Sequence, residues 1–125
     1  MKNDRNSIIY DKSFKFAIKI VNLYKYLCTK QKEYVLSKQL LRSGTSIGAN
    51  INEALEAQTR KDFIAKLAIA LKEASETRYW INLIVATEYL EREHGEILTN
   101  ELTEIIKILN KMIKTAKQNL EKYGR

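Results

Sequence analysis

Proline is absent from the 125-residue sequence, and glycine occurs only four times. Proline breaks helices and glycine is the usual residue of tight turns, so their scarcity excludes a fold with many irregular loops. Leu, Ile, Ala, Lys and Glu are abundant instead, a composition typical of helical proteins. We expect a single all-α domain spanning residues 1–125, long enough for a hydrophobic core.

Cysteine and histidine each occur once. Cys28 falls on an apolar helical stripe, which predicts a small core residue in a reducing compartment. His94 falls in a predicted loop, so the Glu-x-x-His pairs of di-iron bundles are absent. We therefore expect no metal site, no cofactor and no disulfide.

Long apolar runs are also missing. No segment approaches the ~18 consecutive apolar residues of a membrane-spanning helix, and the first residues, MKNDRNSIIYDKSFKF, show no secretion signal. We expect a cytoplasmic protein without a membrane partner.

Basic residues exceed acidic ones, 22 Lys and Arg against 15 Asp and Glu, and the net charge is +7. A basic protein suits a polyanionic partner such as RNA or DNA, although positive charge is equally a means of keeping a protein soluble.

Apolar residues recur at steps of three and four in four segments, the spacing of amphipathic helices. The predicted helices span about 7–29 (or 10–29), 34–58, 61–90 and 100–123. Thr59 is a predicted N-cap, with Asp62 in the first turn that follows. Between helices we expect a polar hinge at 30–33 and a polar loop at 91–99, in which Gly95 stops a helix. Four helices and short connections predict an antiparallel, up-and-down four-helix bundle.

The segment LLRSGTSIGANINEA, residues 40–54, places Gly44 and Gly48 inside a predicted helix. A glycine there costs about 1 kcal/mol relative to alanine, so the pair indicates close packing against neighbouring helices. A stripe of small polar residues lies beside the apolar face and includes Ser46, Asn50 and Glu53. We expect Asn50 and Glu53 to fix the register between helices or subunits.

The predicted helix at 61–90 is apolar on two opposite faces, so part of its second face, which includes Trp80, is expected to meet another subunit. Arg78 lies in the first apolar stripe and needs a carboxylate partner, for which Glu53 is the candidate. Glu73 and Glu76 have the spacing of paired carboxylates, but nothing nearby supplies a nucleophile or a set of metal ligands. The alternative, bonding to neighbouring helices or subunits, is favoured because buried carboxylates are paired.

Lysines gather on two predicted helical surfaces. The first helix combines a wide apolar arc, made of two stripes (Tyr10, Phe14, Ala17, Val21, Tyr24 and Cys28; Phe16, Ile20, Leu23 and Leu27), with a basic edge at Lys12, Lys15 and Lys19. On the fourth helix the stripe is Lys107, Lys111, Lys114 and Lys117, without an intervening acidic residue. Both surfaces are candidates for phosphate contacts, and both are also consistent with a merely solvated face.

The sequence resembles the bacterial 23S rRNA-intervening-sequence proteins, also called S23 or four-helix-bundle proteins. The likeness covers nearly the whole chain and rests on two segments, RSGTSIGANINEA (Arg42, Ser46, Ile47, Asn50, Ile51, Glu53) and KEASETRYW (Lys72, Glu73, Glu76, Thr77, Tyr79, Trp80). One departure is Ala54, where many members have glycine.

The resemblance implies a left-handed, up-and-down bundle that assembles as a homopentamer, with a link to ribosomal RNA. A related branch contains the accessory proteins of diversity-generating retroelements, which bind a reverse transcriptase and nucleic acid.

Two hypotheses follow. In the first, the protein is a basic oligomer that binds RNA or DNA through its lysine surfaces. In the second, it is a homo-oligomeric adaptor for a protein partner such as a polymerase. An enzyme is not expected, because no group of catalytic side chains converges.

Overall fold

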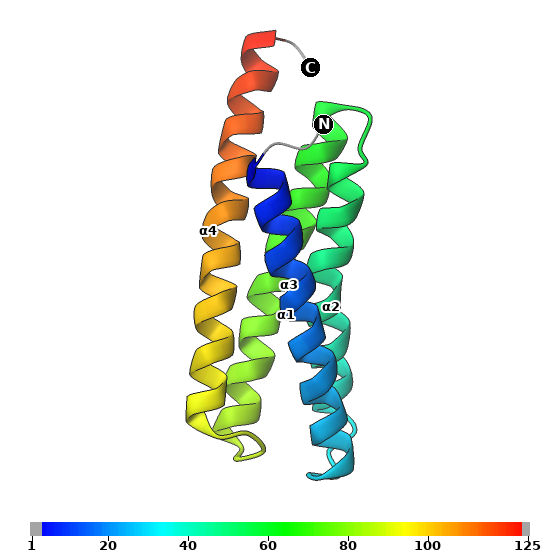
Figure 1. The fold of residues 1–125 in the computed structure, drawn as a ribbon, viewed down its shortest axis with the longest axis vertical. Coiled ribbons are helices and arrows are strands. Elements are labelled where there is room, and N and C mark those ends of the chain that lie inside the picture. Colours follow the sequence, from blue (N-terminus) through cyan, green and yellow to red (C-terminus); the bar gives the residue numbers. More distant parts are fainter. Residues whose placement is uncertain (1–3, 124–125) are drawn as a thin grey trace.

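The computed structural model describes residues 4–123 as four helices, α1 (Asp4–Thr29), α2 (Leu36–Leu55), α3 (Arg60–Ala86) and α4 (Arg92–Tyr123). Successive helices run in opposite directions, so the start of α1, the end of α4 and the α2–α3 turn lie at one end of the molecule (Figure 1). This arrangement confirms the predicted all-α, up-and-down bundle; its left-handed sense stays a prediction. No described helix is long and apolar enough to cross a membrane.

The core is a column of aliphatic side chains to which every helix contributes one stripe. On α1 the buried stripe is the second of the two predicted ones, since Phe16, Ile20 and Leu27 are fully buried whereas Phe14 is 55% exposed. Fully burying a side chain of this size contributes about 1.5–3 kcal/mol, so this column dominates the stability of the bundle. Its other fully buried large members are Ile9, Leu40, Ile47, Ile51, Leu67, Ile81, Ile84, Leu102 and Ile105.

The α1–α2 connection is more structured than the predicted hinge at 30–33. Glu33 is buried, and its carboxylate accepts hydrogen bonds from the backbone N–H groups of Val35, Leu36 and Ser37 at 3.1, 2.9 and 2.7 Å. The Ser37 hydroxyl in turn donates to the Glu33 carbonyl at 2.8 Å. The side chain thus caps the first turn of α2, which begins at Leu36 and not near Tyr34.

This cap determines the ionisation of Glu33. Burial raises the pKa of its carboxyl, but the hydrogen bonds from the backbone of Leu36, Ser37 and Val35 act in the opposite direction and leave the pKa below its ordinary value of 4.5. The charged carboxylate is therefore the form that the folded protein favours.

The start of α3 follows the prediction, and the start of α4 does not. Thr59 is the N-cap of α3, and its hydroxyl accepts from the N–H of Asp62 at 3.1 Å. The loop predicted at 91–99 is wrong, because α4 begins at Arg92 and contains Gly95. Gly95 does not stop a helix: it is buried, and an added Cβ would lie 2.6 Å from Val85 Cγ2. Its small size lets α4 approach α3.

The two glycines of α2 differ in their surroundings. A Cβ at Gly44 would lie 2.8 Å from Cγ2 and 2.9 Å from Cγ1 of Ile20, inside van der Waals contact. A Cβ at Gly48 would lie 3.5 Å from the carbonyl oxygen of Ser13, an ordinary contact. Close approach to α1 therefore requires glycine at position 44 and not at position 48.

We expect Gly44→Ala to destabilise the protein by about 1–3 kcal/mol, because Ile20 must shift within a packed core. Gly48→Ala is the matched control in the same helix, and it should be neutral or stabilise by up to about 1 kcal/mol. Urea denaturation of both variants measures the difference. Equal destabilisation by the two substitutions would contradict this account of α2.

The Glu33 cap makes stability depend on pH. A lowered carboxyl pKa means that the unfolded chain binds the proton more readily, so the stabilisation is present above the unfolded pKa and is lost as pH falls through the folded pKa. Glu33→Gln should cost about 1 kcal/mol at neutral pH, and its difference from the parent should shrink as pH falls below 4.5. Urea denaturation across this range tests it, with the exposed Glu96→Gln as control; a pH-independent difference would rule out a charged cap.

Candidate nucleic-acid interface

The lysines of α1 are paired with carboxylates. Lys12 Nζ lies 2.9 Å from Glu104 Oε1, and Lys19 forms an ion pair with Glu101, so both lysines bridge α1 to α4. Lys15 pairs with Asp11 on its own helix at 3.0 Å. Such exposed pairs contribute little to stability, but they neutralise the local charge.

The pKa of Glu104 reflects this neutralisation. The hydrogen bond and charge of Lys12 hold the pKa of the Glu104 carboxyl below its ordinary value, and the charge of Lys107 adds to the effect. The carboxylates of α4 therefore balance much of the basic edge of α1, which makes that edge the weaker of the two candidate surfaces.

The lysines of α4 have different surroundings. Lys107, Lys111, Lys114 and Lys117 are all exposed, and none takes part in an ion pair with the side chains of residues 5–123. They occupy about three helical turns, a length of about 15 Å. We name these four residues the α4 lysine surface. It is a continuous run of positive charge on one side of the bundle.

A polar network joins α2 to α3 on another side. The guanidinium of Arg42 donates to Glu73 Oε1 at 3.3 Å and to Glu76, and the indole N–H of Trp80 donates to Glu76 Oε2 at 2.9 Å. Glu73 and Glu76 are only 17% and 33% exposed. Arg42 of α2 therefore binds both carboxylates of α3. This contact agrees with the interpretation that Glu73 and Glu76 bond to a neighbouring helix.

Beneath this network lies a pair of hydroxyl groups. The side-chain oxygens of Ser43 and Thr77 are 3.0 Å apart, and both residues are fully buried. Thr77 also donates to the carbonyl of Glu73 at 2.7 Å. These groups satisfy one another's hydrogen bonding inside the α2–α3 contact, so they stabilise one alignment of the two helices.

The predicted pairing of Arg78 with Glu53 is wrong. Arg78 donates to the hydroxyl of Thr103 on α4 at 2.5 Å, while Glu53 pairs with Lys66 on α3 at 2.9 Å. The two residues extend toward different neighbours, because Arg78 lies on the side of α3 that faces α4.

Two further predicted contact residues bond within their own helix. Ser46 Oγ donates to the carbonyl of Arg42 at 2.7 Å, and Asn50 Nδ2 donates to the carbonyl of Ser46 at 2.8 Å. Of the two residues expected to fix the helix register, Glu53 therefore forms an ion pair with a neighbouring helix, whereas the Asn50 side chain donates its hydrogen bond within α2.

The side chains that could hold a metal ion lie apart from one another in the part of the chain that the structure describes. No group of three or more His, Cys, Asp or Glu within residues 4–123 is placed to hold a metal ion. His94 is exposed and lies 3.7 Å from Glu91, at the start of α4.

Comparison with known proteins places this bundle in a family. The family description "23S rRNA-intervening sequence protein" matches residues 5–111. The chain belongs to this family. A crystal structure from Bacteroides thetaiotaomicron, described as a protein of unknown function from the S23 ribosomal protein family, is 59% identical, with a TM-score of 0.87. The match covers 88% of this chain and 98% of that one. No curated protein matches the chain.

The α2–α3 network consists of residues on which the resemblance to this family rests: Arg42, Glu73, Glu76 and Trp80. Other contacts had no clear signal in the sequence. The Glu33 cap and the Arg78–Thr103 bond depend on how a turn closes and on which neighbour a helix faces, and neither can be read from spacing along one segment.

Glu76→Ala should leave the Trp80 indole N–H and the Arg42 guanidinium without their shared acceptor. We expect a loss of about 1–2 kcal/mol and a shift in fluorescence, since Trp80 is the protein's only tryptophan. Lys72→Ala, one turn away and exposed, is the control. Urea denaturation followed by tryptophan emission measures both effects; unchanged emission and stability would show that the network contributes nothing.

Proposed function

We propose that this protein is a non-enzymatic, RNA-binding member of its family that contacts phosphates through the α4 lysine surface. The observation that carries the proposal is that, among the described side chains, none of the four lysines has an ion-pair partner, whereas Lys12, Lys15 and Lys19 on α1 are paired. Unpaired lysines can replace the counterions of a nucleic acid without first breaking an intramolecular pair. The net charge of +7 favours the approach of a polyanion.

The chemistry of this surface favours binding without strong sequence preference. Lysine offers a flexible point charge, and the segment 107–117, KILNKMIKTAK, contains no aromatic residue on which a base could stack. Contacts of this kind position a phosphate backbone but do not distinguish bases. DNA is therefore a possible competitor for the same surface.

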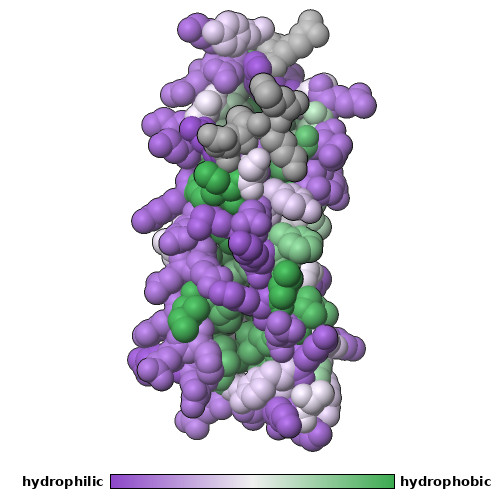
Figure 2. Space-filling model, in the orientation of Figure 1, coloured by the Kyte–Doolittle hydropathy of each residue, from purple (hydrophilic) through white to green (hydrophobic). Residues whose placement is uncertain are grey.

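We further propose that the chain assembles as a homo-oligomer, a pentamer by its resemblance to the family, in the cytoplasm. Supporting this are large apolar side chains at the surface: Phe14 and Ile18 on α1 are 55% and 48% exposed, and Ile69 and Tyr79 on α3 are 41% and 58% exposed. Figure 2 shows hydrophobic patches that interrupt the hydrophilic surface on the face where α1 lies. Each added copy would add another α4 lysine surface, and linked weak sites bind more tightly than single ones.

The same exposed apolar residues favour the alternative function, a homo-oligomeric adaptor that binds a protein partner such as a polymerase. An adaptor needs a surface that a partner can desolvate, and apolar patches on a helical bundle supply one. This function predicts no useful affinity for RNA alone.

Replacing the four lysines of the α4 lysine surface by glutamine should weaken binding of a fluorescent single-stranded RNA at least about tenfold at low salt. The magnitude of the slope of log K against log salt should also fall by about 3, because binding without these four phosphate contacts releases fewer counterions. Fluorescence anisotropy across a salt series measures both.

The matched control replaces four exposed lysines of the α1–α2 region that have no ion-pair partner among the described side chains, Lys25, Lys30, Lys32 and Lys38, and lowers the net charge equally. Equal loss of affinity in both variants would show that bulk charge alone binds RNA. Native mass spectrometry of the parent with and without RNA separates the functions: an oligomer that takes up no RNA supports the adaptor.

A further inference from the structure

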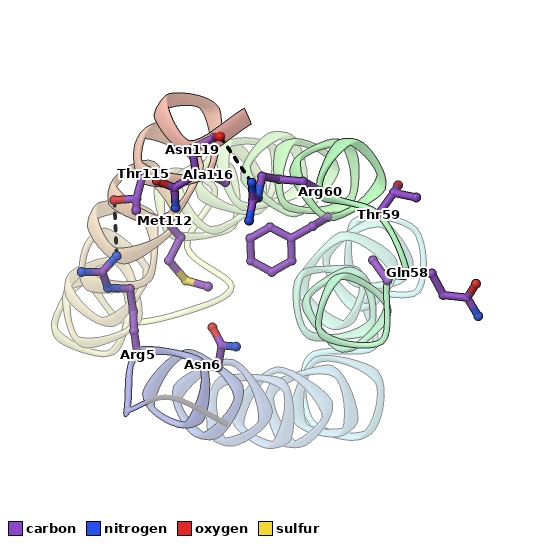
Figure 3. Close-up of a pocket in the computed structure, with 11 residues that line it drawn as sticks. Arg5, Asn6, Gln58, Thr59, Arg60, Met112, Thr115, Ala116 and Asn119 are labelled. Atoms are coloured by element: carbon purple, nitrogen blue, oxygen red, sulfur yellow. Dashed lines mark hydrogen bonds between the residues drawn. The ribbon is translucent and has the colours of Figure 1, made fainter. Parts of the chain in front are cut away.

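A cavity of about 420 Å³ opens at the end of the bundle where α1 and α3 begin. Residues of α1, α3, α4 and the α2–α3 turn line it, as the view in Figure 3 shows. Its lining is mixed, with Phe63 and Met112 as apolar members and several amide and hydroxyl side chains. None of its described lining residues is acidic.

Two arginines from different helices reach into this lining. Arg5 of α1 donates to the hydroxyl of Thr115 at 3.5 Å, and Arg60 of α3 donates to the carbonyl of Asn119 at 3.3 Å. Figure 3 shows both guanidinium groups extending to α4, one from each neighbouring helix. Each bond is long for a hydrogen bond of this type, and each uses one nitrogen of a group that has several N–H donors.

Neither arginine has a carboxylate partner among the side chains of residues 5–123, although both are partly buried. Arg42, by contrast, binds two carboxylates. An anion bound in this cavity would accept the N–H donors of the two guanidinium groups that these hydrogen bonds leave over.

The dipoles of the helices that meet at this cavity do not by themselves make it favourable for an anion. Helices α1 and α3 begin at this end, while α2 ends there and α4 runs past it (Figure 1), so their dipoles largely oppose each other. The positive charge of the cavity comes from the two side chains, whose planar donor arrays suit phosphate.

We propose that this cavity binds the phosphate group of a nucleotide, with Arg5 and Arg60 as its ligands and Phe63 and Met112 against the nucleoside. A volume of about 420 Å³ exceeds what an inorganic phosphate fills and lies within the range of small-molecule sites. The phosphate belongs either to a free mononucleotide or to the 5′ end of an RNA strand. This site shares no lining residue with the α4 lysine surface and does not rest on the proposed function.

Isothermal titration calorimetry with adenosine monophosphate, adenosine and inorganic phosphate tests the site. Adenosine monophosphate should bind at least about tenfold more tightly than either fragment, and Arg5→Gln and Arg60→Gln should each weaken it about tenfold. Lys61→Gln, exposed beside Arg60, and Arg92→Gln, at the opposite end, are controls that should change affinity less than about twofold. Circular dichroism establishes that each variant is folded.

Short RNAs with and without a 5′ phosphate distinguish the two sources. A preference for the phosphorylated strand that Arg60→Gln abolishes assigns the site to an RNA end, and binding of the mononucleotide alone assigns it to a free nucleotide. Absence of saturable binding by either ligand, or equal weakening by the controls, overturns the proposal. The variant lacking the α4 lysines should keep its affinity for the mononucleotide, so failure of one proposal leaves the other standing.

Discussion

Burial of one aliphatic stripe from each helix is the interaction on which the rest of this structure depends. The stripe of α1 reaches the core only because α2 presents glycine at position 44, where a Cβ would collide with Ile20. Gly95 has the same role between α4 and α3. This packing places polar side chains of α2 opposite polar side chains of α3. The hydrogen bonds of Arg42 and of the Ser43–Thr77 pair then stabilise one alignment of the two helices.

The same packing distributes the charge unevenly. Lys12 and Lys19 bind carboxylates on the side of α4 nearest α1, while the lysines on its outer face have no ion-pair partner among the described side chains. At one end of the bundle Arg5 and Arg60 meet a cavity without an acidic residue among its described lining. The lysine run on the outer side of α4 and the two arginines at the end of the bundle are therefore two places where several positive charges gather without a carboxylate partner among residues 5–123, in addition to single exposed lysines elsewhere.

The sequence predicted elements well where the signal was local. The Thr59 cap lies within one turn of the groups that it bonds, and helical periodicity is a property of each segment by itself. The prediction was wrong at residues 91–99, where a polar segment containing glycine has the composition of a loop but forms the start of α4. There the polar side chains lie on the outer surface of α4, and Gly95 and Leu98 face inward. The wrong partner for Arg78 has a similar origin: helical spacing identifies a face but not the neighbour that covers it.

By itself, then, the sequence determined four amphipathic helices, their alternating directions and the family, because these follow from periodicity, short connections and motifs within single segments. Only the tertiary structure decided which charges are free. Lys12 and Glu104 are 92 residues apart along the chain, and Arg5 and Thr115 are 110 apart. Pairing across such distances depends on how far each helix is rotated about its axis in the packed bundle, which no single segment specifies.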